Sequence, residues 1–202
     1  VTHHPLFFQP PRAINEQTLA GRSILELIEH GIAAINLHTN LDCAPGGVND
    51  VLAAKLELEN VRVMQPAGED AQGRPYGLIR IGETEQTDAR TFAAFVKAAL
   101  DCPGVRLADA GKPVRCVAVG GGGCGSEMDA VLAAGCDTFV TADLKYHQFE
   151  EARYHGLNLI DAGHFETENP VCDVLTVLLR ERFPELRVLK SAVHRDEIQF
   201  FG

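Results

Sequence analysis

The sequence has 202 residues, 46% of them hydrophobic and 23% charged, a composition that suits one globular domain. Its formal net charge of −10 disfavours binding to nucleic acid, because an acidic surface is repelled by the phosphate backbone. No apolar run approaches the roughly 18 residues that a membrane-spanning helix needs, so we expect no membrane partner.

The first half of the chain alternates predicted helices with predicted strands. Apolar spacing predicts helices at 23–30 and 48–58, and the first of these ends at a glycine. Apolar runs predict a buried strand at 32–37 and an alternating strand at 77–81. The segment 64–76 is polar and rich in turn residues, which indicates a loop or a boundary between two lobes.

The second half continues the alternation and indicates an α/β fold with largely parallel strand pairing. An acidic N-cap at Asp88 begins a helix at 88–100. Further helices are predicted at 127–134, 148–155 and 170–182. Strands are predicted at 114–119, 138–141, 157–161, 187–189 and 198–201.

Six cysteines are spread along the chain without any C-x-x-C pair. A chain of this size does not need disulfides to fold, so we expect reduced and mostly buried thiols. The sequence therefore predicts a cytoplasmic protein.

Two stretches of the chain resemble each other in the order of their features. Each has V-T at a strand end (1–2 and 140–141), then H-G at a helix end, then H-x-x-x-acid after the next strand. This repeat predicts two related halves, at about 1–63 and 113–202, joined by a connecting region at about 64–112, within one domain. Because a strand, a glycine loop and a helix precede the second V-T, we expect equivalent residues before Val1 in a longer chain.

Histidines and carboxylates follow the predicted strands, where α/β sheets place functional groups. Imidazole and carboxylate together form the ligand set of Zn, Fe, Mn or Co. Adjacent histidines on an extended backbone point apart and could each bind one of two neighbouring ions, with a carboxylate as bridge. The residues of this set are His3, His4, His38, Asp42, Asp143, His147, His164 and Glu168.

Other readings of these residues stay open. His38 could cap a strand end, Asp42 precedes a turn, and Asp143 with His147 could form a structural pair. The glycine run at 120–126 lies between a strand and a helix, as a phosphate-binding loop does, but it lacks the Lys-Ser/Thr of a P-loop. A tight turn beneath a metal site, or a contact with a substrate phosphate, is favoured over dinucleotide binding.

The chain resembles the Nif-three-like proteins, a family with a dinuclear metal centre whose members are also called GTP cyclohydrolase I type 2 homologues. The motifs that carry this resemblance cover nearly the whole chain in order: T-H-H-P-L-F-F (2–8), H-T-N-L-D (38–42), P-G-G-V-N-D (45–50), G-L-I-R-I-G (77–82), V-A-V-G-G-G-G (117–123), T-A-D-L-K-Y-H (141–147) and D-A-G-H-F-E-T-E (161–168). Two departures are Ala142, where glycine is usual, and the C-terminal segment, which lacks the usual Asn/Asp-Pro.

The resemblance implies a pseudo-symmetric α/β fold, about sixty residues before the first histidine pair, and a toroidal homohexamer. It also implies two divalent metal ions per chain, with His38 and His147 close by and facing substrate. The implied ligands are His3, His4, Asp42, His164 and Glu168.

The function expected from this ligand set is metal-dependent hydrolysis of a nucleotide-like substrate, a small cyclic amide or a phosphoester, with His38 or His147 moving protons. The cyclohydrolase activity itself is implied by the resemblance alone. The alternative is a non-enzymatic hexamer that handles metal or regulates other processes.

Overall fold

The computed structural model describes residues 1–201, which fall into two compact units, Val1–Asp42 and Cys43–Gly202. Within the described residues, no helix combines the length and the apolar character needed to cross a membrane.

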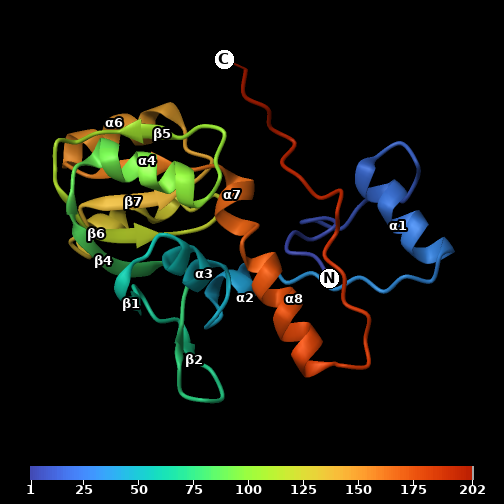
Figure 1. The fold of residues 1–202 in the computed structure, drawn as a ribbon. Coiled ribbons are helices and arrows are strands. Elements are labelled where there is room, and N and C mark those ends of the chain that lie inside the picture. Colours follow the sequence, from blue (N-terminus) through green and yellow to red (C-terminus); the bar gives the residue numbers. More distant parts are fainter. Residues whose placement is uncertain (202) are drawn as a thin grey trace. The chain divides into compact units, whose positions relative to one another are not determined.

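The larger unit is built on a six-stranded sheet of order β1-β4-β6-β7-β8-β5 (Figure 1). The three inner strands β6, β7 and β8 run parallel, and β1, β4 and β5 add to them by antiparallel pairing. The strands are β1 (Glu59–Val63), β4 (Arg80–Thr87), β5 (Arg106–Ala108), β6 (Val114–Val119), β7 (Thr138–Thr141) and β8 (Asn158–Asp161). A separate hairpin pairs β2 (Gly68–Glu69) with β3 (Pro75–Tyr76).

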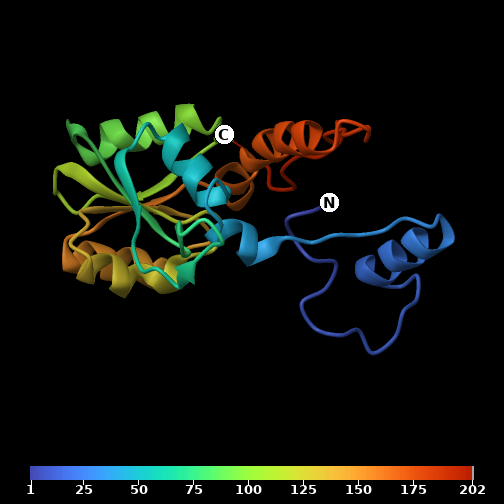
Figure 2. The ribbon, with the colours of Figure 1, turned by 90° about the horizontal axis from the view of Figure 1, so that it is seen from below.

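Helices cover both faces of this sheet, as Figure 2 shows. The helices α3 (Val48–Lys55) and α4 (Ala89–Ala99) pack on one face, and α5 (Met128–Ala133) and α6 (Tyr146–His155) pack on the other. Every residue of β7 and β8 is buried, which explains why these strands read as continuous rather than alternating runs. The parallel pairing also brings the carboxyl ends of β6, β7 and β8 to one edge.

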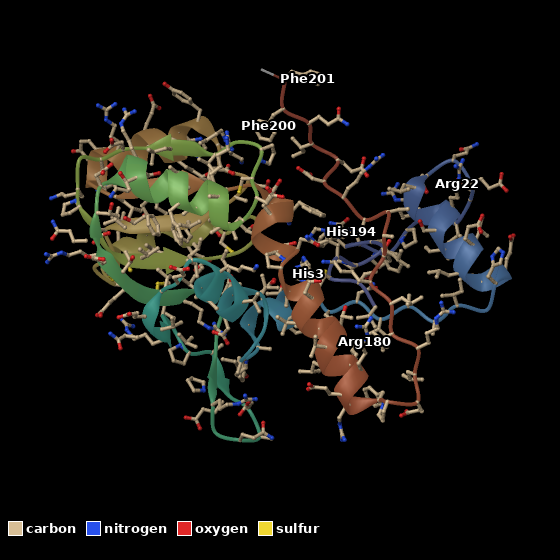
Figure 3. The ribbon with its side chains drawn as sticks, viewed as in Figure 1. His3, Arg22, Arg180, His194, Phe200 and Phe201 are labelled. Carbon is tan, nitrogen blue, oxygen red and sulfur yellow. The ribbon has the colours of Figure 1, made fainter. Side chains whose placement is uncertain are left out.

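After β8 the chain forms the short helix α7 (His164–Glu168) and the longer α8 (Val171–Arg182). The C-terminal segment then turns back along α8, where the Arg180 guanidinium donates to the Val188 carbonyl at 3.0 Å. Further along, the ring of His194 lies 5.0 Å from that of Phe165 on α7, and Phe200 packs over Gly104 (Figure 3).

The smaller unit contains α1 (Leu19–Glu29) and most of α2 (His38–Cys43). Thr18 caps α1, and its hydroxyl accepts a hydrogen bond from the Gly21 amide at 3.0 Å. The extended segments before and after α1 meet at a single parallel bridge between Thr2 and Asn36.

Most of the predicted elements are present. The strands at 114–119 and 138–141 are found as predicted, as are the cap at Asp88 and the parallel pairing of the second half. The segment 64–76 is a loop, apart from the small β2–β3 hairpin.

Three predicted strands are wrong. At 32–37 only Asn36 pairs, because Thr2 is the one residue that bridges to this segment in the described part of the smaller unit. Ile32 and Ile35 are 56% and 57% exposed. At 187–189 the Val188 carbonyl accepts from a side chain rather than from a strand, and 198–201 is irregular.

The structure also contains elements that the sequence did not indicate. They are β1, β5, α2 and α7, each of six residues or fewer and therefore too short for a clear periodic pattern. The proposed pseudo-symmetry and the division into halves at about 1–63 and 113–202 stay predictions.

A buried arginine fixes the chain that follows α2. Arg80 is 1% exposed, and its guanidinium pairs with Asp50 and donates to the carbonyls of Gly77, Cys43 and Ala44. The Asp50 carboxylate also accepts from the Gly46 amide at 2.6 Å. The loop between α2 and α3 therefore depends on one buried ion pair and its hydrogen bonds.

We predict that Arg80→Met lowers the free energy of unfolding by about 3 kcal/mol, because it leaves Asp50 and three carbonyls without their donor. The matched control is Arg90→Met, since the Arg90 side chain is 82% exposed in its pair with Asp109, and it should cost less than about 1 kcal/mol. Urea denaturation measures both changes. Equal, small losses in the two variants would contradict the structural role of Arg80.

Candidate metal centre

Backbone pairing in the smaller unit brings its histidines together. The Leu37 amide donates to the Thr2 carbonyl at 3.0 Å, and the His38 amide donates to the His3 carbonyl at 2.8 Å. These bonds align the histidine pair at the chain start with the first turn of α2. The helix then places Asp42 one turn after His38, on the same face.

The side chains of this group lie within contact distance. The His3 Nε2 atom is 3.4 Å from the Asp42 Oδ1 atom. The His38 ring lies 5.6 Å from the His3 ring and 5.9 Å from the His4 ring, measured between centroids. Four predicted site residues of the smaller unit therefore form one cluster of imidazoles and a carboxylate.

The larger unit holds a second group at the carboxyl edge of its sheet. Asp143 follows β7, and His164 begins α7 directly after β8. The helix places Glu168 four residues on, with its Oε1 atom 3.0 Å from His164 Nε2. The other ring nitrogen, Nδ1, lies 2.7 Å from Asp143 Oδ2. His164 is thus held between two carboxylates.

These two carboxylates change the protonation of His164. The hydrogen bond to Glu168, followed by that to Asp143, raises the pKa of His164 to about 9, although burial opposes the shift. In the metal-free chain the ring is therefore an imidazolium at neutral pH. A divalent cation at Nε2 and Oε1 would replace that proton, while Asp143 would keep the ring oriented through Nδ1.

The glycine loop is shaped around this second group. Gly122 has a φ of +66°, which side chains rarely adopt. A Cβ atom there would lie 2.2 Å from Glu168 Oε1 and 3.2 Å from His164 Nε2. The absence of a side chain at Gly122 is what allows Glu168 Oε1 and His164 Nε2 to occupy their positions.

The amides of this loop are already used within the protein. The Gly121 amide donates to Asn49 Oδ1 at 2.7 Å, and the Gly122 amide donates to Thr167 Oγ1 at 3.0 Å. The Cys124 amide donates to Thr141 Oγ1 at 3.1 Å. These bonds favour a tight turn that supports the ligands over a cradle that presents its amides to a phosphate.

Sequence reasoning missed the polar residues that build this support. Asn49, Thr141 and Thr167 are each no more than 1% exposed and hold the glycine loop from three different elements. Asp161 accepts from the amides of Leu144 and Gly163, which fixes the chain on both sides of β8. For Thr141 and Asp161 the available signal was a polar residue at the end of an otherwise buried strand, whereas Asn49 and Thr167 lie in helices and carried no such signal.

The remaining predicted site residue lies apart from these contacts. His147 is exposed in the first turn of α6. Within the described residues it forms no hydrogen bond or ion pair with Asp143, whose carboxylate binds His164 instead. The structure therefore pairs Asp143 with His164 rather than with His147.

Comparison with known proteins places the chain in a family. The family model described as Duf34/NIF3 (NGG1p interacting factor 3) matches residues 1–197. The chain belongs to the Duf34/NIF3 family. This membership confirms the resemblance that the sequence motifs indicate.

Relatives and solved structures support the same assignment. A protein of Streptomyces coelicolor named GTP cyclohydrolase 1 type 2 homolog is 42% identical over 90% of this chain. The chain spans 65% of the length of that relative. A protein of the same name from Clostridium perfringens is 30% identical over 99% of this chain and 76% of its own length. A Bacillus cereus protein related to NIF3 superposes with a TM-score of 0.88 at 25% identity, covering 98% of this chain and 82% of its own.

The pKa of His164 predicts how the stability of the metal-free chain depends on pH. The folded-state pKa of about 9 lies above the ordinary value of 6.5. The ion pairs of His164 therefore contribute fully below pH 6.5, and the contribution is lost as pH rises through 9. Thermal melts of the chelator-treated chain should show a falling Tm between pH 6.5 and 9.5, and His164→Gln should flatten this part of the profile. An unchanged slope in the variant would contradict the assignment.

Proposed function

We propose that this Duf34/NIF3 protein binds two divalent metal ions and uses them to hydrolyse a small substrate. The proposed ligands are His3, His4, Asp42, His164 and Glu168. The observation that carries the proposal is the arrangement at His164, whose Nδ1 is held by Asp143 and whose Nε2 faces Glu168 Oε1 at 3.0 Å. An imidazole oriented by a carboxylate through its other nitrogen is typical of metal-binding histidines.

The donor atoms fit such a centre. Both groups combine imidazole nitrogen with carboxylate oxygen, and in both the two atom types face each other, at 3.4 Å for His3 and Asp42. Mixed ligands of this kind suit Zn, Fe, Mn or Co. The glycine at position 122 leaves the space that the Glu168 carboxylate occupies.

The proposed reaction class draws on the names of the relatives, GTP cyclohydrolase 1 type 2 homologs, and on the ligand set. Two bound divalent ions would polarise a substrate oxygen and activate water at neutral pH. The proposed substrate is nucleotide-like, a small cyclic amide or a phosphoester.

The residues around the ligands would orient the substrate and move protons. His38 is the better placed proton carrier, because its ring adjoins those of His3 and His4. Its Nδ1 lies 3.2 Å from the Thr39 hydroxyl, so Nε2 is the atom proposed to exchange a proton with substrate. His147 is the second proposed carrier, reached from the solvent side of α6.

A homohexamer is also proposed, as the family resemblance implies. Exposed apolar side chains on one face of α8 support subunit association: Val174, Val177 and Leu178 are 41%, 53% and 55% exposed, and the last two lie three and four residues after the first.

Substitution at Gly122 tests the metal centre. The wild-type chain should carry about two ions by elemental analysis, and Gly122→Ala should weaken binding tenfold or more, because its Cβ would displace Glu168 Oε1. Gly111→Ala is the matched control, since Gly111 has a similar φ of +70° but open space around it. Competition with a chromophoric chelator measures both affinities. Equal affinities in the two variants would contradict the proposed site.

Turnover tests the reaction. The metal-loaded protein is incubated with GTP and with panels of phosphoesters and cyclic amides, followed by chromatography of the products. Hydrolysis of one class should be lost by at least a hundredfold in His3→Ala and Glu168→Ala, which remove proposed ligands. Tight metal binding without turnover across the panels would instead support a metal-handling or regulatory role.

A further inference from the structure

Two cysteine sulfur atoms meet at the end of the sheet opposite to the glycine loop. Cys116 lies in β6, and Cys136 lies two residues before β7. Their Sγ atoms are 3.6 Å apart. The parallel register of Val117 with Thr138 makes Cys116 and Cys136 diagonal neighbours on adjacent strands.

The backbone around the pair is held firmly. The Asp137 amide donates to the Cys116 carbonyl at 3.1 Å, and the Cys116 amide donates to Asp137 Oδ2 at 2.9 Å. The two sulfur atoms therefore stay close without any rearrangement of the strands. Disulfide formation would need the sulfur atoms to approach from 3.6 Å to about 2.05 Å.

Two other cysteines of the larger unit make different contacts. Cys102 Sγ donates to the Ala162 carbonyl at 3.1 Å, and Cys124 Sγ donates to the Gly121 carbonyl at 3.3 Å. Both thiols are buried against the backbone. Cys116 is only partly buried, so an oxidant can reach one member of the pair.

We propose that Cys116 and Cys136 form a thiol-oxidation site that closes to an intramolecular disulfide when it reacts with a hydroperoxide. The Cys116 sulfur attacks one peroxide oxygen, the O–O bond breaks, and the thiol proton passes to the departing oxygen, which gives a Cys116 sulfenic acid and one water or alcohol. The Cys136 sulfur then attacks the Cys116 sulfur, the S–O bond breaks, and the departing hydroxide takes the Cys136 thiol proton and leaves as water. Two thiols lose two electrons in total, and one peroxide is reduced.

The surroundings assign the order of these steps. Burial, followed by the neighbouring Cys116, raises the pKa of the Cys136 thiol to about 12, so Cys136 is a poor first nucleophile. Cys116 is the more exposed residue of the pair and reacts first. Cys136 is then the nearest thiol that can resolve the sulfenic acid.

The disulfide would enclose residues 117–135, which include the glycine loop, η1 (Gly125–Glu127) and α5. The sulfur atoms lie at the amino ends of the two strands, whereas Gly122 and Asp143 follow their carboxyl ends. The proposed oxidation site is therefore separate from the proposed metal ligands.

Peptide mapping of the full chain tests the proposal. The reduced protein is treated with hydrogen peroxide, remaining thiols are blocked with N-ethylmaleimide, and the chain is cut with trypsin and a glutamate-specific protease. Cleavage after Arg115, Glu127 and Lys145 separates 116–127 from 128–145. The expected product is these two peptides joined, two hydrogens lighter than their sum, and released by dithiothreitol.

Variants identify which sulfur atoms are joined. Because Cys116 and Cys124 share the first peptide, the joined product should disappear in Cys116→Ser and persist in Cys124→Ser. Cys172→Ser, which alters another partly buried thiol, should also keep it. Full maleimide labelling of both wild-type cysteines after peroxide would overturn the proposal, as would sulfinic acid on Cys116 without the joined product. Where Cys116→Ser does not fold, fragmentation of the joined wild-type peptides by tandem mass spectrometry assigns the bond to Cys116 or to Cys124, and a bond to Cys124 would overturn the proposal.

Discussion

The hydrogen bonds that hold residues 121–124 determine the geometry of the candidate centre in the larger unit. Asn49 from α3, Thr141 from β7 and Thr167 from α7 each bind one amide of this loop, and all three side chains are buried. A buried amide that lost its acceptor would cost about 1–3 kcal/mol, so each bond strongly favours this one arrangement. The loop therefore joins three elements at the position where Gly122 meets Glu168.

The parallel sheet explains why the ligands reach this position. Since β6, β7 and β8 are parallel and adjacent, the chain leaves all three at the same edge, first as the glycine loop, then as Asp143, then as His164. Asp161 at the end of β8 accepts from both the Leu144 and the Gly163 amides, so the backbone just after Asp143 and just before His164 is fixed. The pairing of His164 with Asp143 is thus a consequence of strand order.

Some of the strands could be predicted from the sequence, but fewer of the side-chain contacts at the candidate site could be. The strands β6 and β7 could be predicted because each is a short run dominated by apolar residues, fully buried in β7 and buried at four of the six positions in β6. The predicted strand at 32–37 looked similar, but an apolar run becomes a strand only when a neighbouring strand accepts its backbone hydrogen bonds. The histidines and carboxylates of the candidate site could be chosen by residue type and position after strands. The histidine that pairs with Asp143 could not be chosen in this way. His147 is near in sequence, whereas His164 is brought close only by the β7–β8 pairing.

The sheet also separates two kinds of reactivity along the same pair of strands. The carboxyl end of β7 leads to Asp143, and that of β8 leads to His164 and Glu168, so oxygen and nitrogen donors gather at this edge. The amino ends of β6 and β7 lie beside two sulfur atoms packed against the core that α5 and α6 cover. Soft thiolates would compete with the oxygen and nitrogen donors for Zn or Fe, and the one cysteine of the glycine loop, Cys124, is buried with its Sγ donating to the Gly121 carbonyl. The Cys116–Cys136 pair lies one strand length away, so one sheet can carry a proposed metal centre and a proposed oxidation site without either using the other's residues.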